Sequence, residues 1–228
     1  TGLFALQIDK DGQIVADSRL TWEKDVAQFI PVNEKGRLED VGYLYYHNIT
    51  QDNQGRFYAV AEQYHRSVSA LGIVALAAGQ PASATKLVTE DLMIFEFSPE
   101  FGLEGVEFFE KTKNDIILPV NVDFVPIQTL GLVLDQYDAF DYYFTQTNTS
   151  KSMFAATYLD AEKTKGLWKT PIFGAIVHTE EGYTVDKINL QTDATSLFVL
   201  PAKPGHVMIA EYNRKEKSLS LRLEPINY

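Results

Sequence analysis

The chain has 228 residues, of which 45% are hydrophobic and 12% aromatic, so it can bury a sizeable core and is not a disordered tail. Its net charge of −11 at pH 7 argues against a nucleic-acid partner, which needs clustered Lys and Arg, and equally against adhesion to anionic lipid. Because the chain has no cysteine, disulfides, thiol catalysis and cysteine metal sites are excluded. The longest apolar run, residues 70–78, is far shorter than the roughly 20 residues that span a bilayer, and we expect no membrane insertion.

A hairpin is predicted at the start of the chain. Residues 3–8 and 13–17 read as strands around Asp9-Lys-Asp-Gly12, and Asp-Gly favours a tight turn because both residues accept positive φ. Residues 18–22 are expected to close this unit, and residues 29–40 read as a connecting loop.

The clearest unit covers residues 41–110 and predicts a four-stranded antiparallel sheet. Its expected strands are residues 42–49, 56–64, 92–97 and 103–110. The first two strands are apolar on both faces and must be covered on both sides, whereas the last is half polar, as an outer strand would be. Residues 66–90 interrupt the sheet, and their apolar core is either a short element packed on the main body or an exposed partner contact.

The same pattern of short strands separated by polar turns recurs in the second half of the chain. After a strand at 114–118 and a helical rhythm at 126–137, strands are expected at residues 140–146, 153–159, 171–178, 183–190, 196–200, 206–212 and 218–224. Short strands at regular spacing indicate a sandwich, a barrel or a propeller, and doubly apolar inner strands favour stacked sheets. We therefore predict an all-β fold of antiparallel four-stranded repeats, β-propeller-like and complete or partial, with one or two short helices. It would form a single domain over residues 1–228, with blade-like units at about 1–40, 41–118, 138–192 and 195–228.

No motif for metal, cofactor or nucleophile chemistry is present. The turn at residues 9–12 has an acidic pair but lacks the remaining ligands of a calcium loop, and the turn at residues 52–55 is likewise interpreted as a plain turn. The four histidines show no metal-ligand spacing and are interpreted as core or edge residues; they are His47, His65, His178 and His206. The basic groups at 111–113 and 214–217 read as solvated turns. We predict no catalytic residue, no metal site and no cofactor.

Among the acidic residues inside predicted strands we single out Glu62, Glu96 and Asp141. A carboxylate in a strand is costly to bury unpaired, and Tyr64, Arg66 and Tyr142 are possible partners. Two carboxylates flanking a glycosidic bond would make a hydrolase. Convergence of the three in one cleft would favour an enzyme, and their separation would favour a binding protein.

Aromatic side chains suggest a binding surface for a sugar or a peptide. Most of them fill space between sheets, but those beside polar groups combine an apolar body with a polar tip. We select Tyr64, His65, Tyr142 and Trp168 as candidate ligand-binding residues, with Trp168 in the polar connector of residues 164–170.

Several strings together resemble a known family. They are Trp22-Glu-Lys-Asp-Val-Ala-Gln-Phe29, Glu62-Gln-Tyr64, Leu87-Val-Thr-Glu-Asp91 with Ile94-Phe-Glu-Phe97, Phe140-Asp-Tyr142 with Phe144-Thr-Gln146, and Arg214-Lys-Glu-Lys217 before Leu221-Arg-Leu-Glu224. They resemble the C-terminal half of a family of exported, uncharacterised, β-propeller-like proteins of Gram-negative bacteria. The resemblance implies an exported chain (periplasmic, cell-surface or secreted) with an N-terminal portion absent here, and it carries over no catalytic residue. A start at Thr1 without Met, and already at the beginning of a hairpin, agrees with that expectation.

The leading hypothesis is an exported, non-enzymatic binding or scaffold module. Its partner would be a protein or a glycan at the cell envelope. The alternative is a glycoside-active enzyme on a propeller fold. In a third, structural interpretation, this chain completes a ring with the missing N-terminal portion.

Overall fold

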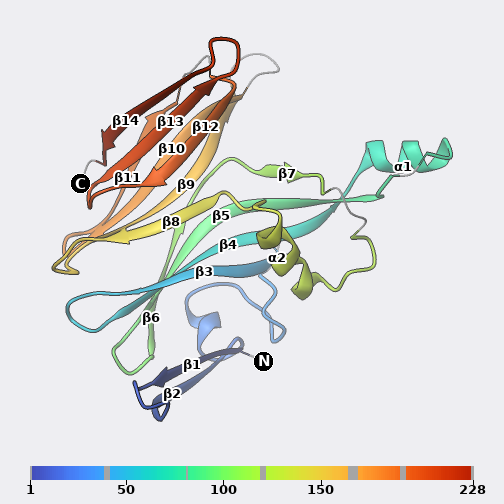
Figure 1. The fold of residues 1–228 in the computed structure, drawn as a ribbon. Helices are drawn as coiled ribbons and strands as arrows, with labels where there is room; N and C mark the ends of the chain where they lie inside the picture. The colour runs from blue at the N-terminus through green and yellow to red at the C-terminus, as the bar shows by residue number, and fades with distance from the viewer. Residues whose placement is uncertain are drawn as a thin grey trace. The chain divides into compact units, whose positions relative to one another are not determined.

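Antiparallel strands dominate the computed structural model, which describes residues 2–38, 42–80, 82–118, 122–163, 169–190 and 194–226 (Figure 1). The all-β expectation with two short helices is confirmed. The first ten elements are β1 (Gly2–Ile8), β2 (Ile14–Thr21), the 3-10 helix η1 (Val26–Gln28), β3 (Tyr43–Gln51), β4 (Phe57–Val68), α1 (Ala70–Ala77), β5 (Thr85–Phe97), β6 (Leu103–Phe109), β7 (Asn114–Ile116) and α2 (Ile127–Gln136). The others are β8 (Tyr142–Thr147), β9 (Phe154–Lys163), β10 (Lys169–Thr179), β11 (Gly182–Asn189), β12 (Ser196–Pro201), β13 (His206–Asn213) and β14 (Ser218–Pro225).

The strands form four separate sheets. Their orders are β1-β2, then β3-β4-β5-β6 with β7 also paired to β5, then β11-β10-β9-β8, and finally β12-β13-β14. All pairs are antiparallel, and no sheet closes on itself within the described residues. The predicted four-stranded sheet around β9 is present, and the predicted strands around β4 form a sheet that β7 extends to five strands. The first and last sheets contain two and three strands, so a repeat of four strands is not kept throughout the described residues.

The chain divides into two compact units. Unit 1 contains Thr1–Ile49 and Gln54–Phe140, and unit 2 contains Thr50–Asn53 and Asp141–Tyr228. Unit 1 therefore holds the β1-β2 hairpin, the large sheet and both helices. Unit 2 holds the other two sheets.

Unit 1 has a core on each side of its large sheet. On one side, Ala59, Ala61 and Phe95 pack with residues of the η1 segment. On the other side, Tyr64 and Leu87 pack with residues of α2. This agrees with the apolar residues on both faces of the β4 sequence, because a central strand covered on both sides needs apolar residues at every position.

The core of unit 2 joins its two sheets. Alternate residues of β10, Phe173, Ala175 and Val177, pack against Val207 and Ile209 of β13. The period of two is that of a strand with one face on this core. By contrast, β14 exposes Leu219, Leu221 and Leu223, although they alternate with polar residues along the strand.

Three strands extend beyond the ends that the sequence predicts. β2 continues from Ile14 to Thr21, whereas its expected strand ended at Asp17. β4 runs to Val68 and β5 already begins at Thr85, so the insertion of residues 66–90 shrinks to the hairpin end that carries α1. The pairing that extends these strands, from Tyr64–Thr89 to Val68–Thr85, is between backbones and leaves little trace in side-chain periodicity.

Candidate functional site

The polar centre of unit 1 is organised by a β-bulge between β4 and β5. Glu62 pairs with Leu92 and Tyr64 with Thr89, so Gln63 alone faces two residues, Glu90 and Asp91. A bulge re-aims side chains and bends the strand that holds the extra residue. At this bulge, the acidic residues Glu62, Glu90 and Asp91 lie in otherwise apolar strands.

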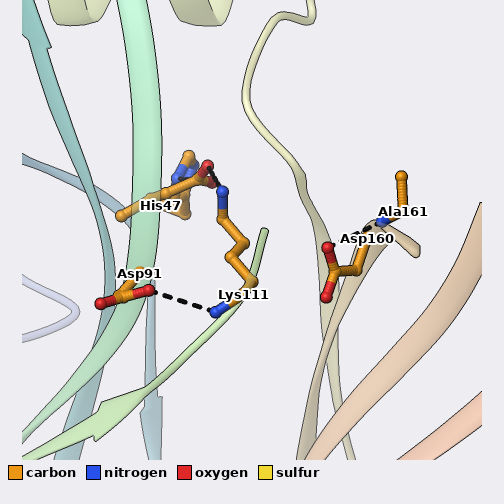
Figure 2. A network of polar contacts seen from close by, with 6 residues as sticks. His47, Asp91, Lys111, Asp160 and Ala161 are labelled. Carbon is orange, nitrogen blue, oxygen red and sulfur yellow. Dashed lines mark hydrogen bonds and ion pairs between the residues drawn. The ribbon is translucent and has the colours of Figure 1, made fainter. Parts of the chain in front are cut away.

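An inner ionic cluster, defined as His47, Glu62 and Lys111, is buried beside this bulge. The Glu62 Oε2 atom lies 3.4 Å from His47 Nε2, and Glu62 Oε1 lies 3.3 Å from Lys111 Nζ. The Glu62 and Lys111 side chains are both 0% exposed. Lys111 follows β6, and its backbone N–H donates to Asp91 Oδ1 at 3.1 Å, as Figure 2 shows. The cluster thus fixes the segment after β6 to β3, β4 and β5.

An outer ionic cluster, defined as His65, Glu90 and Lys113, lies nearer to solvent. Lys113 Nζ is 2.6 Å from Glu90 Oε1, and His65 Nδ1 is 3.6 Å from the same oxygen. The Lys113 side chain is 69% exposed, whereas Glu90 is buried. Burial raises the pKa of the neighbouring Asp91, and the Glu90 charge adds to that rise, while the N–H of Lys111 opposes it.

Aromatic rings form one wall beside the inner ionic cluster. The Phe140 ring stacks on Tyr45, with centroids 4.9 Å apart, and meets the edge of His47 at 4.7 Å. The Tyr64 hydroxyl donates to the Ile127 carbonyl of α2 at 3.0 Å, and burial raises the pKa of Tyr64 to about 12. Gly131 lets α2 approach, because a Cβ there would lie 2.8 Å from the Tyr45 ring.

The geometry does not resemble a glycosidase pair. The Glu62–Leu92 and Tyr58–Glu96 pairs lie four residues apart along β4, which is about 13 Å of strand, and the Glu96 side chain lies beside Gly105 of β6. Glu62 is closed off from solvent and already faces two basic groups. Asp141 belongs to unit 2, where its carbonyl accepts from Leu159 N at 2.8 Å. In the described ranges, no group of three or more His, Asp and Glu could hold a metal ion.

The structure places the candidate ligand-binding residues in different settings. Tyr64 is 2% exposed and lies in the core, while His65, next to it on β4, belongs to the outer ionic cluster. Tyr142 lies on β8 in unit 2, with its hydroxyl 3.0 Å from Thr145 Oγ1. Trp168 lies outside the described residues. The role of the four residues in binding stays a prediction.

Two residues of the inner ionic cluster were missed by sequence reasoning. Lys111 was expected in a solvated turn, and this was wrong, because its side chain is buried against Glu62. His47 was interpreted only as a core or edge histidine. The available signal was Glu62 itself, since an acidic residue in an apolar strand requires a partner.

A second feature of unit 1 is an exposed apolar helix. We call the apolar tip the five side chains Val68, Leu71, Ile73, Val74 and Leu76, all of which are exposed. Ser69 caps the helix by accepting from Gly72 N at 3.0 Å, and Gly72 is the buried residue of α1. The packed alternative for residues 66–90 is therefore wrong for these side chains. No helix in the described part of the chain is long and apolar enough to cross a membrane.

The fold and these features define a two-unit, mostly β protein with buried ionic clusters and an exposed apolar helix. The chain belongs to a family of unknown function, DUF6770, which matches it over residues 1–227. Neither a curated protein nor a solved structure matches the chain. The expectation of an uncharacterised family is thus confirmed, while the Gram-negative origin and export of the chain stay predictions.

Proposed function

We propose that this protein is a non-enzymatic binding or scaffold module that is exported and acts at the cell envelope on a protein or glycan partner. The observation that carries the proposal is the burial of the inner ionic cluster. A general acid or base must reach its substrate, and Glu62 is fully enclosed between His47 and Lys111. Its charge holds strands and a loop together instead of facing a cleft.

The glycoside-active alternative receives less support from the same geometry. The buried carboxylate of Glu62 faces His47 and Lys111 and is not placed to contact a glycosidic bond. The family match adds no activity, because it is a family of unknown function. The net charge of −11 also disfavours a nucleic-acid partner.

The propeller arrangement is part of this proposal as well. Its support is the face-to-face packing of the two sheets of unit 2, where β10 contacts β13. The central strands are buried from Tyr58 to Tyr64 in β4 and from Ile172 to His178 in β10. Such an arrangement offers loops and strand edges as binding surfaces while the strands serve as scaffold.

The test is a binding experiment with envelope polymers. The purified chain would be incubated with insoluble peptidoglycan sacculi and with a printed array of polysaccharides, and bound protein would be measured against concentration. Saturable binding without shortening of the polymer is expected. Release of soluble fragments from the bound polymer would contradict the proposal and favour the enzyme.

A further inference from the structure

The apolar tip has no single apolar stripe. At about 100° per residue, Leu71, Ile73, Val74 and Leu76 spread over more than half of the circumference of α1, and Gly72 packs against the Ser83 carbonyl. Leu71 is 85% and Val74 67% exposed. A helix that docks in a protein groove uses one stripe of apolar residues, whereas a helix that is apolar all round fits an environment that surrounds it.

The tip is also free of charge in an otherwise highly charged chain. Residues 67–85 contain no Asp, Glu, Lys or Arg, and the stretch is flanked by Arg66 and Lys86. Figure 1 shows α1 at the end of the β4–β5 hairpin, beyond the paired part of these strands. The first charged residues on either side of the tip, Arg66 and Lys86, therefore lie at the base of the hairpin.

The base is held by a second segment, residues 122–125. Arg66 Nη2 donates to the carbonyls of Val122 and Val125 at 2.7 and 2.8 Å. Asp123 Oδ1 accepts from Ser83 Oγ at 2.6 Å and Thr85 Oγ1 at 2.5 Å, and these two hydrogen bonds lower the pKa of Asp123. The tip is thus mounted on a polar base that stays charged at neutral pH.

Further apolar groups surround this base. Phe124 is 95% exposed, and Ile117 is equally open to solvent. Between α1, β5 and the β7 segment lies a cavity of about 300 Å³, lined by residues that include Leu71, Ala75, Leu87, Ile116 and Leu118. Exposed apolar surface of this extent, rimmed by polar groups, marks an interaction site.

We propose that the apolar tip, together with Ile117 and Phe124, inserts into the interfacial layer of a membrane of neutral phospholipid. Lipid acyl chains contact an inserted helix tip around most of its circumference, which fits the wide spread of Leu71, Ile73 and Val74 around α1. The net charge of −11 disfavours an anionic surface, which leaves neutral headgroups. The sequence-based expectation of no membrane insertion rested on the length of the apolar runs, and an interfacial tip needs no spanning length.

This contact goes beyond the proposed binding function and can be tested separately. Because the chain has no cysteine, Val74→Cys gives a single site for an environment-sensitive nitrobenzoxadiazole dye. Vesicles of phosphatidylcholine should shift its emission to the blue, and Leu219→Cys, exposed on β14 in unit 2, should show no shift. In sedimentation with the same vesicles, the double variant Leu71→Glu with Val74→Glu should lower partitioning by about tenfold or more.

The matched control in sedimentation is Leu219→Glu with Leu223→Glu, which adds the same charge to exposed leucines of unit 2. This control should bind vesicles like the unmodified chain. Absence of a blue shift at Val74→Cys, or equal loss of binding in both double variants, would overturn the proposal. So would an oligomer, seen by analytical ultracentrifugation without lipid, that the Leu71→Glu and Val74→Glu changes dissociate, because the tip would then contact a second copy. Sacculus binding by the tip variant reports on the proposed function independently.

Discussion

At the residue scale, the central feature is an acidic group placed between two basic ones in an apolar sheet. Burying charges costs desolvation energy that only good partners offset, and Glu62 has His47 and Lys111 within 3.4 Å. From the sequence, Glu62 was recognisable as a group that needed a partner. Its partners were not, because they come from β3 and from the segment after β6, and only the sheet register brings these together.

Removing one member of this cluster should destabilise the fold strongly. Lys111→Met leaves Glu62 without its closest cation, and we expect a loss of about 3–5 kcal/mol in the free energy of unfolding, measured by urea denaturation. The control is Lys113→Met, whose side chain is 69% exposed and whose loss should cost about 0–1 kcal/mol. The double variant Glu62→Gln with Lys111→Met should recover much of the stability. Equal losses for Lys111→Met and Lys113→Met would contradict the structural role of the inner ionic cluster.

A second residue-scale prediction concerns Tyr158 and alkaline pH. Its hydroxyl is buried and has no hydrogen-bond partner among the described residues, and burial together with the charge of Asp160 raises its pKa to about 12. The folded state therefore holds this proton more tightly than the unfolded state, so the stabilisation is complete below pH 10 and is lost as the pH rises towards 12.

The variant Tyr158→Phe cannot ionise. Its free energy of unfolding should fall less between pH 8 and pH 11 than that of the unmodified chain. At pH 7 it should be as stable or slightly more stable, because an unsatisfied buried hydroxyl is removed. Urea denaturation at the three pH values measures both effects. Parallel losses in the two proteins would show that Tyr158 does not contribute to the alkaline transition.

At the element scale, hairpins whose turns contain characteristic turn residues could be predicted from the sequence. The extension of strands through backbone pairing alone could not. The turn at residues 9–12 forms as expected, with Asp9 Oδ1 accepting from the N–H groups of Asp11 and Gln13 and with Gly12 at φ +81°. The beginning of β5 at Thr85 was missed, since small residues precede it and its pairing involves main chain. The bulge opposite Gln63 was equally invisible, because it changes the register without changing the composition.

One close approach between strands gives a prediction at this scale. Gly174 of β10 pairs with Tyr158 of β9, and a Cβ at this glycine would lie 2.2 Å from the Tyr158 ring. Gly174→Ala should therefore displace the ring and cost about 1–3 kcal/mol or more in the free energy of unfolding. In Gly105→Ala the nearest atom, on the Glu96 side chain, would be 3.5 Å away, an ordinary contact. A Gly174→Ala variant as stable as Gly105→Ala would refute the packing of Tyr158 over β10.

At the scale of the whole molecule, the sequence predicted the class of fold and the sign of the net charge, but not the arrangement of the sheets. The all-β content follows from alternating aromatic and β-branched strands. The number of strands in each sheet does not, because the two-stranded and three-stranded sheets use the same local patterns as the larger ones. The exposed tip was visible only as an apolar stretch, and exposure is a tertiary property.

Net charge should govern which membrane the tip prefers. Since the chain carries −11, adding phosphatidylserine to phosphatidylcholine vesicles should weaken binding, and raising the salt concentration should restore part of it through screening. Sedimentation at increasing phosphatidylserine content measures this. Stronger binding to the anionic vesicles would show that a local basic patch, not the apolar tip, makes the contact.

The most direct test of the account asks whether the inner ionic cluster takes part in catalysis. Hydrolysis of a panel of nitrophenyl glycosides and polysaccharides would be measured for the unmodified chain and for Glu62→Gln, with circular dichroism to verify folding. We expect no turnover by either protein, because Glu62 is 0% exposed and bound between His47 and Lys111. Turnover by the unmodified chain that is lost in a folded Glu62→Gln variant would contradict the account and identify an enzyme.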